Sequence, residues 1–212
     1  MKILMLGPQG AGKGTQAQRL AEVRGAAHIS TGDIVRAEIK SGSDLGEKVK
    51  GYNDRGELVP DEIIVEMAKP HLRDTESWIL DGFPRNESQA RSLDEALEEI
   101  GERLDGAVAL EAPDDDLVNR ISGRRQSKTT GRVYHVDHDP PPVDDPGPFI
   151  QRDDDTEEAI RRRLEIYHSE TEPLKQYYSG QGLLVTVDAL QEIPAVTEEI
   201  LAALGEDGKV GA

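Results

Sequence analysis

The chain opens with Ile3-Leu4-Met5-Leu6, followed directly by Gly7-Pro8-Gln9-Gly10-Ala11-Gly12-Lys13. Four apolar residues ended by a glycine-rich turn are typical of a strand buried in a parallel sheet. The segment from Gly7 to Lys13 fits G-x-x-x-x-G-K, in which successive backbone N–H groups cradle a phosphate at a helix N-terminus and the lysine adds a point charge. An ordinary glycine-rich turn with a solvated lysine is the alternative, which this strand–loop–helix context disfavours.

The residues after the lysine depart from the general pattern. A serine or threonine usually follows the lysine and binds Mg²⁺ directly. Here Gly14 follows Lys13, and the hydroxyl arrives one position later, at Thr15. We therefore expect a magnesium ion to be held mainly by water and phosphate oxygens.

The composition narrows the possible functions. The 212 residues carry 42 acidic and 25 basic side chains, a net charge of −17 and no cysteine. The lack of cysteine excludes disulfides, thiolate nucleophiles and cysteine-ligated metal sites. Such an acidic surface repels nucleic acids and anionic membranes, so we expect neither as a partner. No apolar run approaches the roughly 18 residues of a spanning helix, and no signal peptide is evident. We expect a soluble cytoplasmic protein.

The basic residues add an expectation about salt. Nine are lysine and sixteen are arginine. A lysine deficit on an acidic surface suggests adaptation to high salt, because screening removes the self-repulsion of the carboxylates.

Strand-like and helix-like segments alternate along the chain. Strands are expected at 3–6, 27–29, 78–81, 107–110 and 183–187, with helices between them. This alternation predicts an α/β fold of the P-loop NTPase type, with a five-stranded parallel sheet covered by helices on both faces. Residues 126–151 are polar and proline-rich, which predicts an inserted lobe or loop. A long helix is expected from about Asp155, with Asp154 and Glu157 as its capping box.

A second motif, Asp81-Gly82-Phe83-Pro84-Arg85, follows the strand at 78–81. The carboxyl ends of parallel strands share one edge, so Asp81 is expected to face the phosphate loop and to hold the water shell of Mg²⁺. Arg85 would add a bidentate phosphate clamp there. A plain strand-end turn remains the alternative, since Asp-Gly and Phe-Pro suit turns.

Arginines gather on both sides of the proline-rich segment. Arg120 and Arg124 share one face of a predicted helix, while Arg152 and Arg163 follow the segment. In so acidic a chain this arrangement suggests neutralisation of phosphates. The alternative is a set of salt bridges, which we favour for Arg125, Arg161 and Arg162.

Taken together, these residues resemble the adenylate kinase family from end to end. The resemblance rests on several motifs in order: residues 7–16, Ile29-Ser30-Thr31-Gly32-Asp33, Glu57-Leu58-Val59-Pro60-Asp61, residues 81–85, Gly123-Arg124-Arg125, residues 131–135 and Arg152-Asp153-Asp154-Asp155. It implies a core at 1–29, 60–121 and 157–212, a monophosphate-binding lobe at 30–59 and a lid at 122–156.

The resemblance also implies a set of site residues. The ATP site would comprise Gly10, Ala11, Gly12, Lys13, Gly14, Thr15, Arg120, Arg124, Val133, Tyr134 and Gln191. The AMP site would comprise Thr31, Arg36, Glu57, Leu58, Val59, Gly82, Phe83, Pro84, Arg85, Gln89, Arg152 and Arg163. Lys13, Arg85, Arg120, Arg124, Arg152 and Arg163 would act on the transferred phosphoryl group. Gln89 suits base recognition, because a side-chain amide pairs with an adenine edge.

The implied reaction is MgATP plus AMP giving two ADP, by a monomer. Some members of the family stabilise a longer lid with zinc on four cysteines or with a polar network. Here the lid between Tyr134 and Arg152 looks truncated, as in a short-lid form, so no structural zinc is expected, and the lid prolines are our candidate for stiffening it. Two alternatives stay open. A kinase for UMP or CMP would differ in base recognition, chiefly at Gln89, and a nucleotide-binding regulator would bind without transfer.

Overall fold

The computed structural model describes residues 1–54, 59–73, 75–137, 139–151, 155–205 and 208–210. Its centre is a five-stranded parallel sheet in the order β2-β3-β1-β4-β8. The strands are β1 (Lys2–Leu6), β2 (Ala27–Ser30), β3 (Trp78–Asp81), β4 (Gly106–Glu111) and β8 (Leu184–Asp188). The predicted fold class is confirmed. The short apolar runs between the helices pair as a parallel sheet that is buried on both faces.

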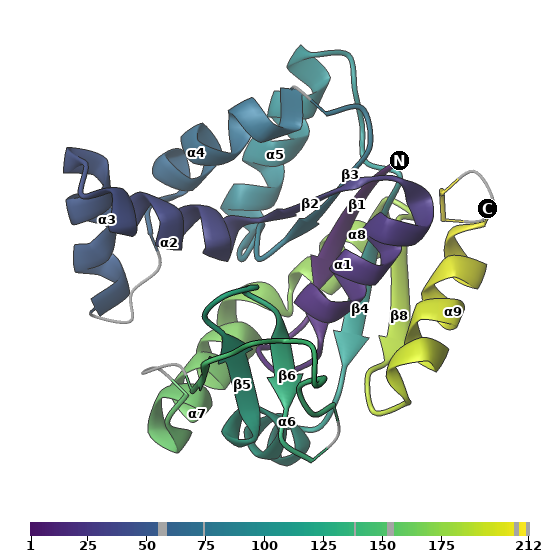
Figure 1. Ribbon diagram of the computed structural model, residues 1–212. Coiled ribbons are helices and arrows are strands. Elements are labelled where there is room, and N and C mark those ends of the chain that lie inside the picture. The colour runs from purple at the N-terminus through teal and green to yellow at the C-terminus, as the bar shows by residue number, and fades with distance from the viewer. Residues whose placement is uncertain (55–58, 74, 138, 152–154, 206–207, 211–212) are drawn as a thin grey trace.

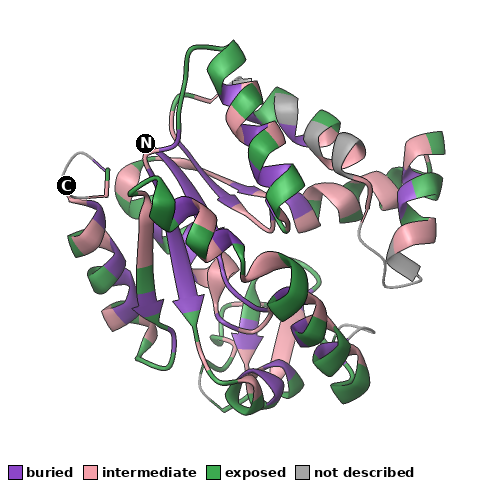
Figure 2. Cartoon of the chain, turned by 180° about the vertical axis from the view of Figure 1, so that it is seen from behind, coloured by how far each residue is buried: buried purple, intermediate pink, exposed green. Residues whose placement is uncertain are grey.

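The two faces of β1 show how the core divides. Ile3 and Met5 point to one hydrophobic cluster, and Leu4 and Leu6 to another. The first cluster is covered by α1 (Lys13–Arg24), α6 (Asp114–Ser122), α7 (Glu157–Ile166) and α9 (Ile193–Leu204). The second is covered by α4 (Asp61–Arg73), α5 (Glu87–Glu99) and α8 (Leu174–Gly180). The central strands are accordingly buried and the outer helix faces exposed (Figure 2).

Two parts project from this core. Helices α2 (Thr31–Ser41) and α3 (Asp44–Asp54) extend away from the β2 side of the sheet (Figure 1). The other part is a small antiparallel sheet in the order β6-β5-β7, built from β5 (Arg124–Ser127), β6 (Val133–His135) and β7 (Phe149–Ile150). An insertion was predicted at 126–151, but this sheet was not, because strands of two to four largely polar residues leave no clear periodicity.

The segment after the small sheet differs from the predicted single long helix. Helix α7 begins at Glu157, capped by Thr156, whose hydroxyl accepts the N–H of Ala159 at 3.3 Å. The proposed capping residue Asp154 lies outside the described residues. A π-helical turn at Tyr167–Thr171 follows, and Pro173 precedes α8, so the helical segment is interrupted before this proline.

Candidate active site

The phosphate loop joins β1 to α1 at the carboxyl edge of the sheet. Gly7 and Gly10 adopt φ of 138° and 89°, values that disfavour any residue with a side chain. A Cβ at Gly7 would lie 2.6 Å from the carbonyl oxygen of Leu110, and one at Gly10 would lie 2.9 Å from Ile121 Cγ1. The loop backbone therefore packs directly on neighbouring elements, which fixes where its N–H groups point.

The start of α1 is left open for an anion. Its N-cap is Gly12, which provides no side-chain hydrogen bond, and its first turn contains no acidic residue. The backbone N–H groups of a first helical turn lack partners within the helix, and the helix dipole adds partial positive charge. This end of α1 can therefore bind phosphate oxygens.

Lys13 lies at the centre of a charged cluster. Its Nζ donates to the carbonyl oxygen of Pro8 at 2.9 Å. Burial lowers the pKa of Lys13; the nearby carboxylate of Asp81 opposes this shift, and the positive charges of Arg85 and Arg124 reinforce it. The lysine ammonium therefore lies among other cations, an environment that an anionic ligand would stabilise.

Asp81 reaches the loop from the end of β3, as expected. The register pairs Met5 of β1 and Ser30 of β2 with Asp81. A Cβ at Gly14 would lie 3.4 Å from Asp81 Oδ2, so the carboxylate faces the first turn of α1. Imidazole Nε2 of His28 lies 3.9 Å from the same oxygen. The carboxylate thus lies beside the phosphate loop, where a metal-bound water could contact it.

Arg85 extends the cluster toward α2 and α7. Its Nε donates to the carbonyl oxygen of Gly82 at 2.8 Å. Although part of Arg85 faces solvent, loss of hydration around its guanidinium lowers its pKa; Asp81 opposes this shift, and Arg163 and Arg36 reinforce it. Lys13, Arg36, Arg85, Arg124 and Arg163 are therefore brought within electrostatic reach of one another, directly or through Arg85.

The turn at 82–85 is held by its neighbours. The Thr31 hydroxyl donates to the carbonyl oxygen of Asp81 at 3.2 Å. Gln89 is buried, and its Oε1 accepts the backbone N–H of Arg85 at 2.7 Å. Thr171 Oγ1 donates to the carbonyl oxygen of Arg85 at 2.6 Å. Gln89 lies at the edge of the turn and also stabilises it. This stabilising role was not predicted from the sequence.

Other expected site residues bond elsewhere. The Arg124 guanidinium forms an ion pair with the carboxylate of Asp155, with Nε 3.0 Å from Oδ2. Arg36 pairs with Asp33 at 2.5 Å. Tyr134 bonds within the small sheet region, and the Gln191 amide donates to Glu199 at 2.5 Å. Glu57, Leu58 and Arg152 lie outside the described residues, while Val59 is half-buried, and Val133 and Gln191 are exposed.

Salt bridging was expected for Arg125, Arg161 and Arg162. It is observed for Arg161, which pairs with Glu157 at 2.9 Å. Arg125 instead donates to the carbonyl oxygens of Ser122 and Arg124, so its expected carboxylate partner is replaced by backbone. Arg162 is exposed.

A carboxylate that the sequence analysis left unassigned organises the small sheet region. Asp145 accepts hydrogen bonds from the hydroxyls of Ser127, Thr130 and Tyr134, each at 2.8 Å, and from the N–H of Gly147 at 2.9 Å. Burial alone would raise the pKa of Asp145, but these four donors lower it to about 2. Asp145 and its donors come together only in the fold. In the sequence, the hydroxyl residues at 127 and 130 were a signal that a hydrogen-bonded site could form there.

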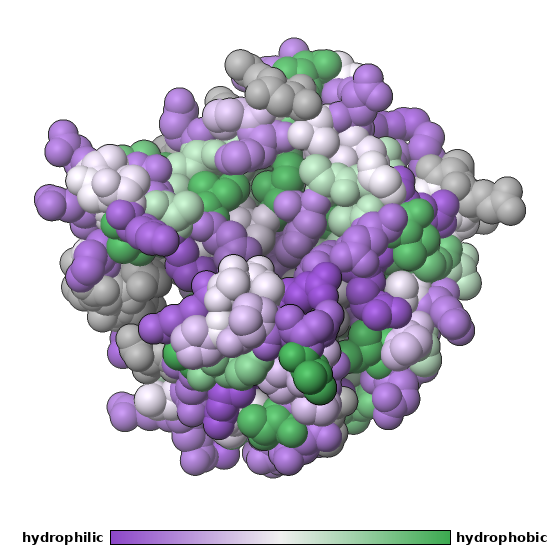
Figure 3. Space-filling view, in the orientation of Figure 1, coloured by the Kyte–Doolittle hydropathy of each residue, from purple (hydrophilic) through white to green (hydrophobic). Residues whose placement is uncertain are grey.

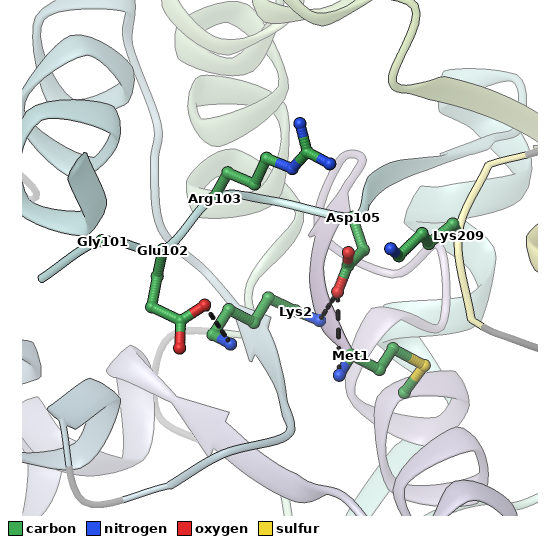
Figure 4. Close-up of a pocket in the computed structure, with 7 residues that line it drawn as sticks. All are labelled: Met1, Lys2, Gly101, Glu102, Arg103, Asp105 and Lys209. Atoms are coloured by element: carbon green, nitrogen blue, oxygen red, sulfur yellow. Dashed lines mark hydrogen bonds and ion pairs between the residues drawn. The ribbon is translucent and has the colours of Figure 1, made fainter.

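The surface agrees with a site at the carboxyl edge of the sheet. The face between the α2–α3 pair and the small sheet is hollowed and surrounded by many hydrophilic side chains (Figure 3). A different recess, of about 390 Å³, lies at the opposite edge and is lined by Met1, Lys2, Gly101, Glu102, Arg103, Asp105 and Lys209 (Figure 4). There Lys2 pairs with Glu102 at 3.0 Å, and Asp105 accepts the backbone N–H of Lys2 at 2.8 Å. This second recess begins where β1 begins, so the phosphate loop is not part of it.

Comparison with known proteins identifies the family. A family model described as adenylate kinase matches residues 5–183. The chain belongs to the adenylate kinase family. It is 47% identical to the adenylate kinase of Streptomyces coelicolor, over 98% of this chain and all of the relative. It is 47% identical to that of Streptomyces avermitilis, over 96% and 97%, and 45% identical to that of Caldicellulosiruptor bescii, over 97% and 99%. As an adenylate kinase, the chain transfers a phosphoryl group from MgATP to AMP, giving two ADP.

Among the described residues, no helix has both the length and the apolar character needed to cross a bilayer.

Proposed function

We propose that this adenylate kinase binds the phosphates of ATP on Gly10–Thr15 and the phosphate of AMP beside Arg85, with Lys13 and Arg85 both contacting the transferred group. The observation that carries the proposal is that Lys13 and Arg85 both lie within electrostatic reach of Asp81, with Arg124 close to Lys13 and Arg163 close to Arg85. In a chain with a net charge of −17, such a concentration of cations calls for anionic ligands.

The remaining contacts follow the resemblance to the family. ATP would also meet Arg120, Arg124, Val133, Tyr134 and Gln191. AMP would also meet Thr31, Arg36, Glu57, Leu58, Val59, Gly82, Phe83, Pro84, Gln89, Arg152 and Arg163. Gln89 lies at the edge of the 82–85 turn, where its Oε1 accepts the backbone N–H of Arg85, and we assign its side-chain amide to the adenine edge.

A magnesium ion would be held by few protein oxygens. Among the residues that the structure describes, no group of three or more histidine or acidic side chains could ligate a metal. Asp81, next to the first turn of α1, supplies one carboxylate. Mg²⁺ commonly keeps several waters and binds through one or two carboxylates and substrate phosphates, so this donor set fits it. The ion would supply charge neutralisation at the β- and γ-phosphates.

The protein's part in the reaction is positioning and charge neutralisation. The second pKa of a phosphate monoester is about 6, so the attacking oxygen of AMP is already ionised at neutral pH and needs no general base. Lys13 and the arginines would align the two phosphates for in-line transfer and stabilise the charge of the transition state. Exclusion of water prevents hydrolysis of ATP. We assign that task to closure of the lobes 30–59 and 122–156 over the core formed by 1–29, 60–121 and 157–212.

The test is the turnover of Lys13→Ala. It should lower the rate of ADP formation from MgATP and AMP by orders of magnitude while leaving the urea unfolding curve unchanged. Lys175→Ala is the matched control. Lys175 lies on α8, pairs with Glu111 at 2.7 Å and has no assigned contact with nucleotide. Near-normal turnover in Lys13→Ala would defeat the proposal.

The choice of acceptor tests the Gln89 assignment separately. AMP, UMP, CMP and GMP are compared as acceptors with wild-type enzyme and with Gln89→Met. We expect AMP to be preferred by the wild type and the preference to weaken in the variant. A pyrimidine preference in the wild type would leave the mechanism intact and remove Gln89 as the base-reading residue.

We further propose a monomeric, cytoplasmic, salt-adapted enzyme that binds no nucleic acid. The support is the composition, 42 acidic against 25 basic residues with only nine lysines. Screening by salt would relieve repulsion among the carboxylates. The melting temperature should therefore rise from dilute buffer to molar KCl, and a higher value in dilute buffer would contradict the proposal.

A further inference from the structure

Gln9 lies within the phosphate loop, and its side chain reaches a helix that is distant in sequence. Its Oε1 accepts a hydrogen bond from Nη1 of Arg163 at 3.0 Å, across 154 positions of the chain. Both residues are half-buried. The bond joins the loop to α7, the helix that follows the small antiparallel sheet. It therefore helps to set where the Arg163 guanidinium lies relative to the backbone that binds phosphate.

The charges around Arg163 explain why an amide suits this position. Arg163 lies close enough to Arg85 to lower the pKa of that guanidinium, so the two cations repel each other. A carboxylate in the loop would hold Arg163 but would also repel the phosphates that the loop binds. The amide of Gln9 holds the guanidinium through a neutral oxygen. A phosphate oxygen can displace it, because hydrogen bonds between charged groups are the stronger ones.

From this contact we infer that Gln9 is a positioning residue for phosphoryl transfer, whose amide oxygen holds the Arg163 guanidinium at the phosphate loop until a phosphate replaces it. The inference rests on the proposed function, since that assigns Arg163 to the reacting phosphates. Gln9 acts through Arg163 and contacts no nucleotide in this scheme. Its contribution is preorganisation, because a cation already in place needs little rearrangement as charge develops.

The test uses variants that remove the acceptor and little else. Gln9→Met keeps the length of the side chain and removes the amide. Gln18→Met is the matched control, because Gln18 is exposed on α1 and its amide donates to the neighbouring Glu22 at 3.2 Å. The values of kcat and of KM for ATP and AMP are measured for both variants, for Arg163→Met, and for the double variant Gln9→Met/Arg163→Met.

We expect Gln9→Met to lower kcat by about threefold to tenfold, the size expected when a reacting geometry loosens without losing a catalytic group. The KM for ATP should change by less than about twofold, since the loop backbone that binds the nucleotide is intact. Gln18→Met should match the wild type. In the Arg163→Met background, Gln9→Met should cause no further loss, because the residue that it positions is gone.

Three results would overturn the inference. These are an unchanged kcat in Gln9→Met, an increase in the KM for ATP with kcat retained, or the same loss of kcat with and without Arg163. Wild-type turnover in Arg163→Met would instead refute the proposed role of Arg163, so the two failures are distinguishable. Urea midpoints from Trp78 fluorescence check folding. If Gln9→Met unfolds, Gln9→Asn, which keeps the amide but shortens its reach, should show the same loss.

Discussion

Removal of the Asp155 carboxylate should destabilise the enzyme through the ion pair with Arg124. The Asp155 side chain is fully buried, and that of Arg124 is 15% exposed. Loss of one partner from a buried pair typically costs about 3 to 5 kcal/mol, because the other charge is left unpaired. Since Arg124 can regain some hydration, we expect the lower end for Asp155→Ala, about 3 kcal/mol. For a chain of 212 residues, that corresponds to a melting temperature lower by roughly 6 to 12 °C.

The assay is urea unfolding, followed by circular dichroism and by the fluorescence of Trp78, the single tryptophan, which is buried in the core. Asp115→Ala is the control, because Asp115 is 88% exposed and lies 3.7 Å from Arg161. Exposed pairs contribute about 0 to 1 kcal/mol, so this variant should stay close to the wild type.

Salt separates the two variants further. Buried pairs are screened much less than exposed ones, so the loss in Asp155→Ala should persist in molar KCl. Arg124→Met should cost at least as much, because it leaves the fully buried Asp155 carboxylate without its cation. The reasoning is refuted if Asp155→Ala unfolds within about 1 kcal/mol of Asp115→Ala, a difference that ordinary surface substitutions can produce.

Three further substitutions test other parts of the structure. Hydrogen bonds with the carboxylates of Glu172 and Asp114 raise the pKa of His168. Its contribution to the free energy of unfolding should therefore be complete below its unfolded pKa of about 6.5 and be lost as pH rises through the higher folded value. The melting temperatures of wild type and His168→Gln should converge at alkaline pH. Four donors lower the pKa of Asp145 to about 2. Its contribution to stability should therefore be present above about pH 4 and be lost as pH falls toward 2. At neutral pH, Asp145→Ala should speed proteolysis within 122–156. Thr197→Val should lower the free energy of unfolding by about 1 to 3 kcal/mol, because it leaves buried Gln16 without the hydroxyl that bonds it at 2.7 Å, whereas Thr197→Ser should retain most of it.

The strand, the glycine-rich turn and the helix that together hold Lys13 were predictable in their order from the sequence. An apolar run ended by glycine specifies a buried strand, and the helix that starts at Lys13 is observed as Lys13–Arg24. These features depend on neighbours in sequence. The carboxylate of Asp81 also reached its expected place, because parallel strands of similar length align their carboxyl ends at one edge.

Features that depend on distant residues could not be predicted in this way. Asp145 lies in the polar, proline-rich segment 126–151, and its donors become a set only when the turn after β5 meets the segment before β7. Asp155 was expected at the start of a helix, but its pairing with Arg124 spans 31 positions. The lid prolines remain our prediction for what stiffens the lid. The hydrogen-bonded carboxylate of Asp145 was not predicted from the sequence pattern.

The partners of the cations indicate how the site is prepared for nucleotide. Lys13 donates to the carbonyl oxygen of Pro8 and Arg85 to the carbonyl oxygen of Gly82, and a phosphate can replace these neutral oxygens at little cost. Arg124 differs, because its partner is the buried carboxylate of Asp155. If Arg124 binds phosphate, it must either give up that pair or use the nitrogen that the pair leaves over. Lys13 and Arg85 are therefore prepared in advance, whereas recruitment of Arg124 should require rearrangement around β5.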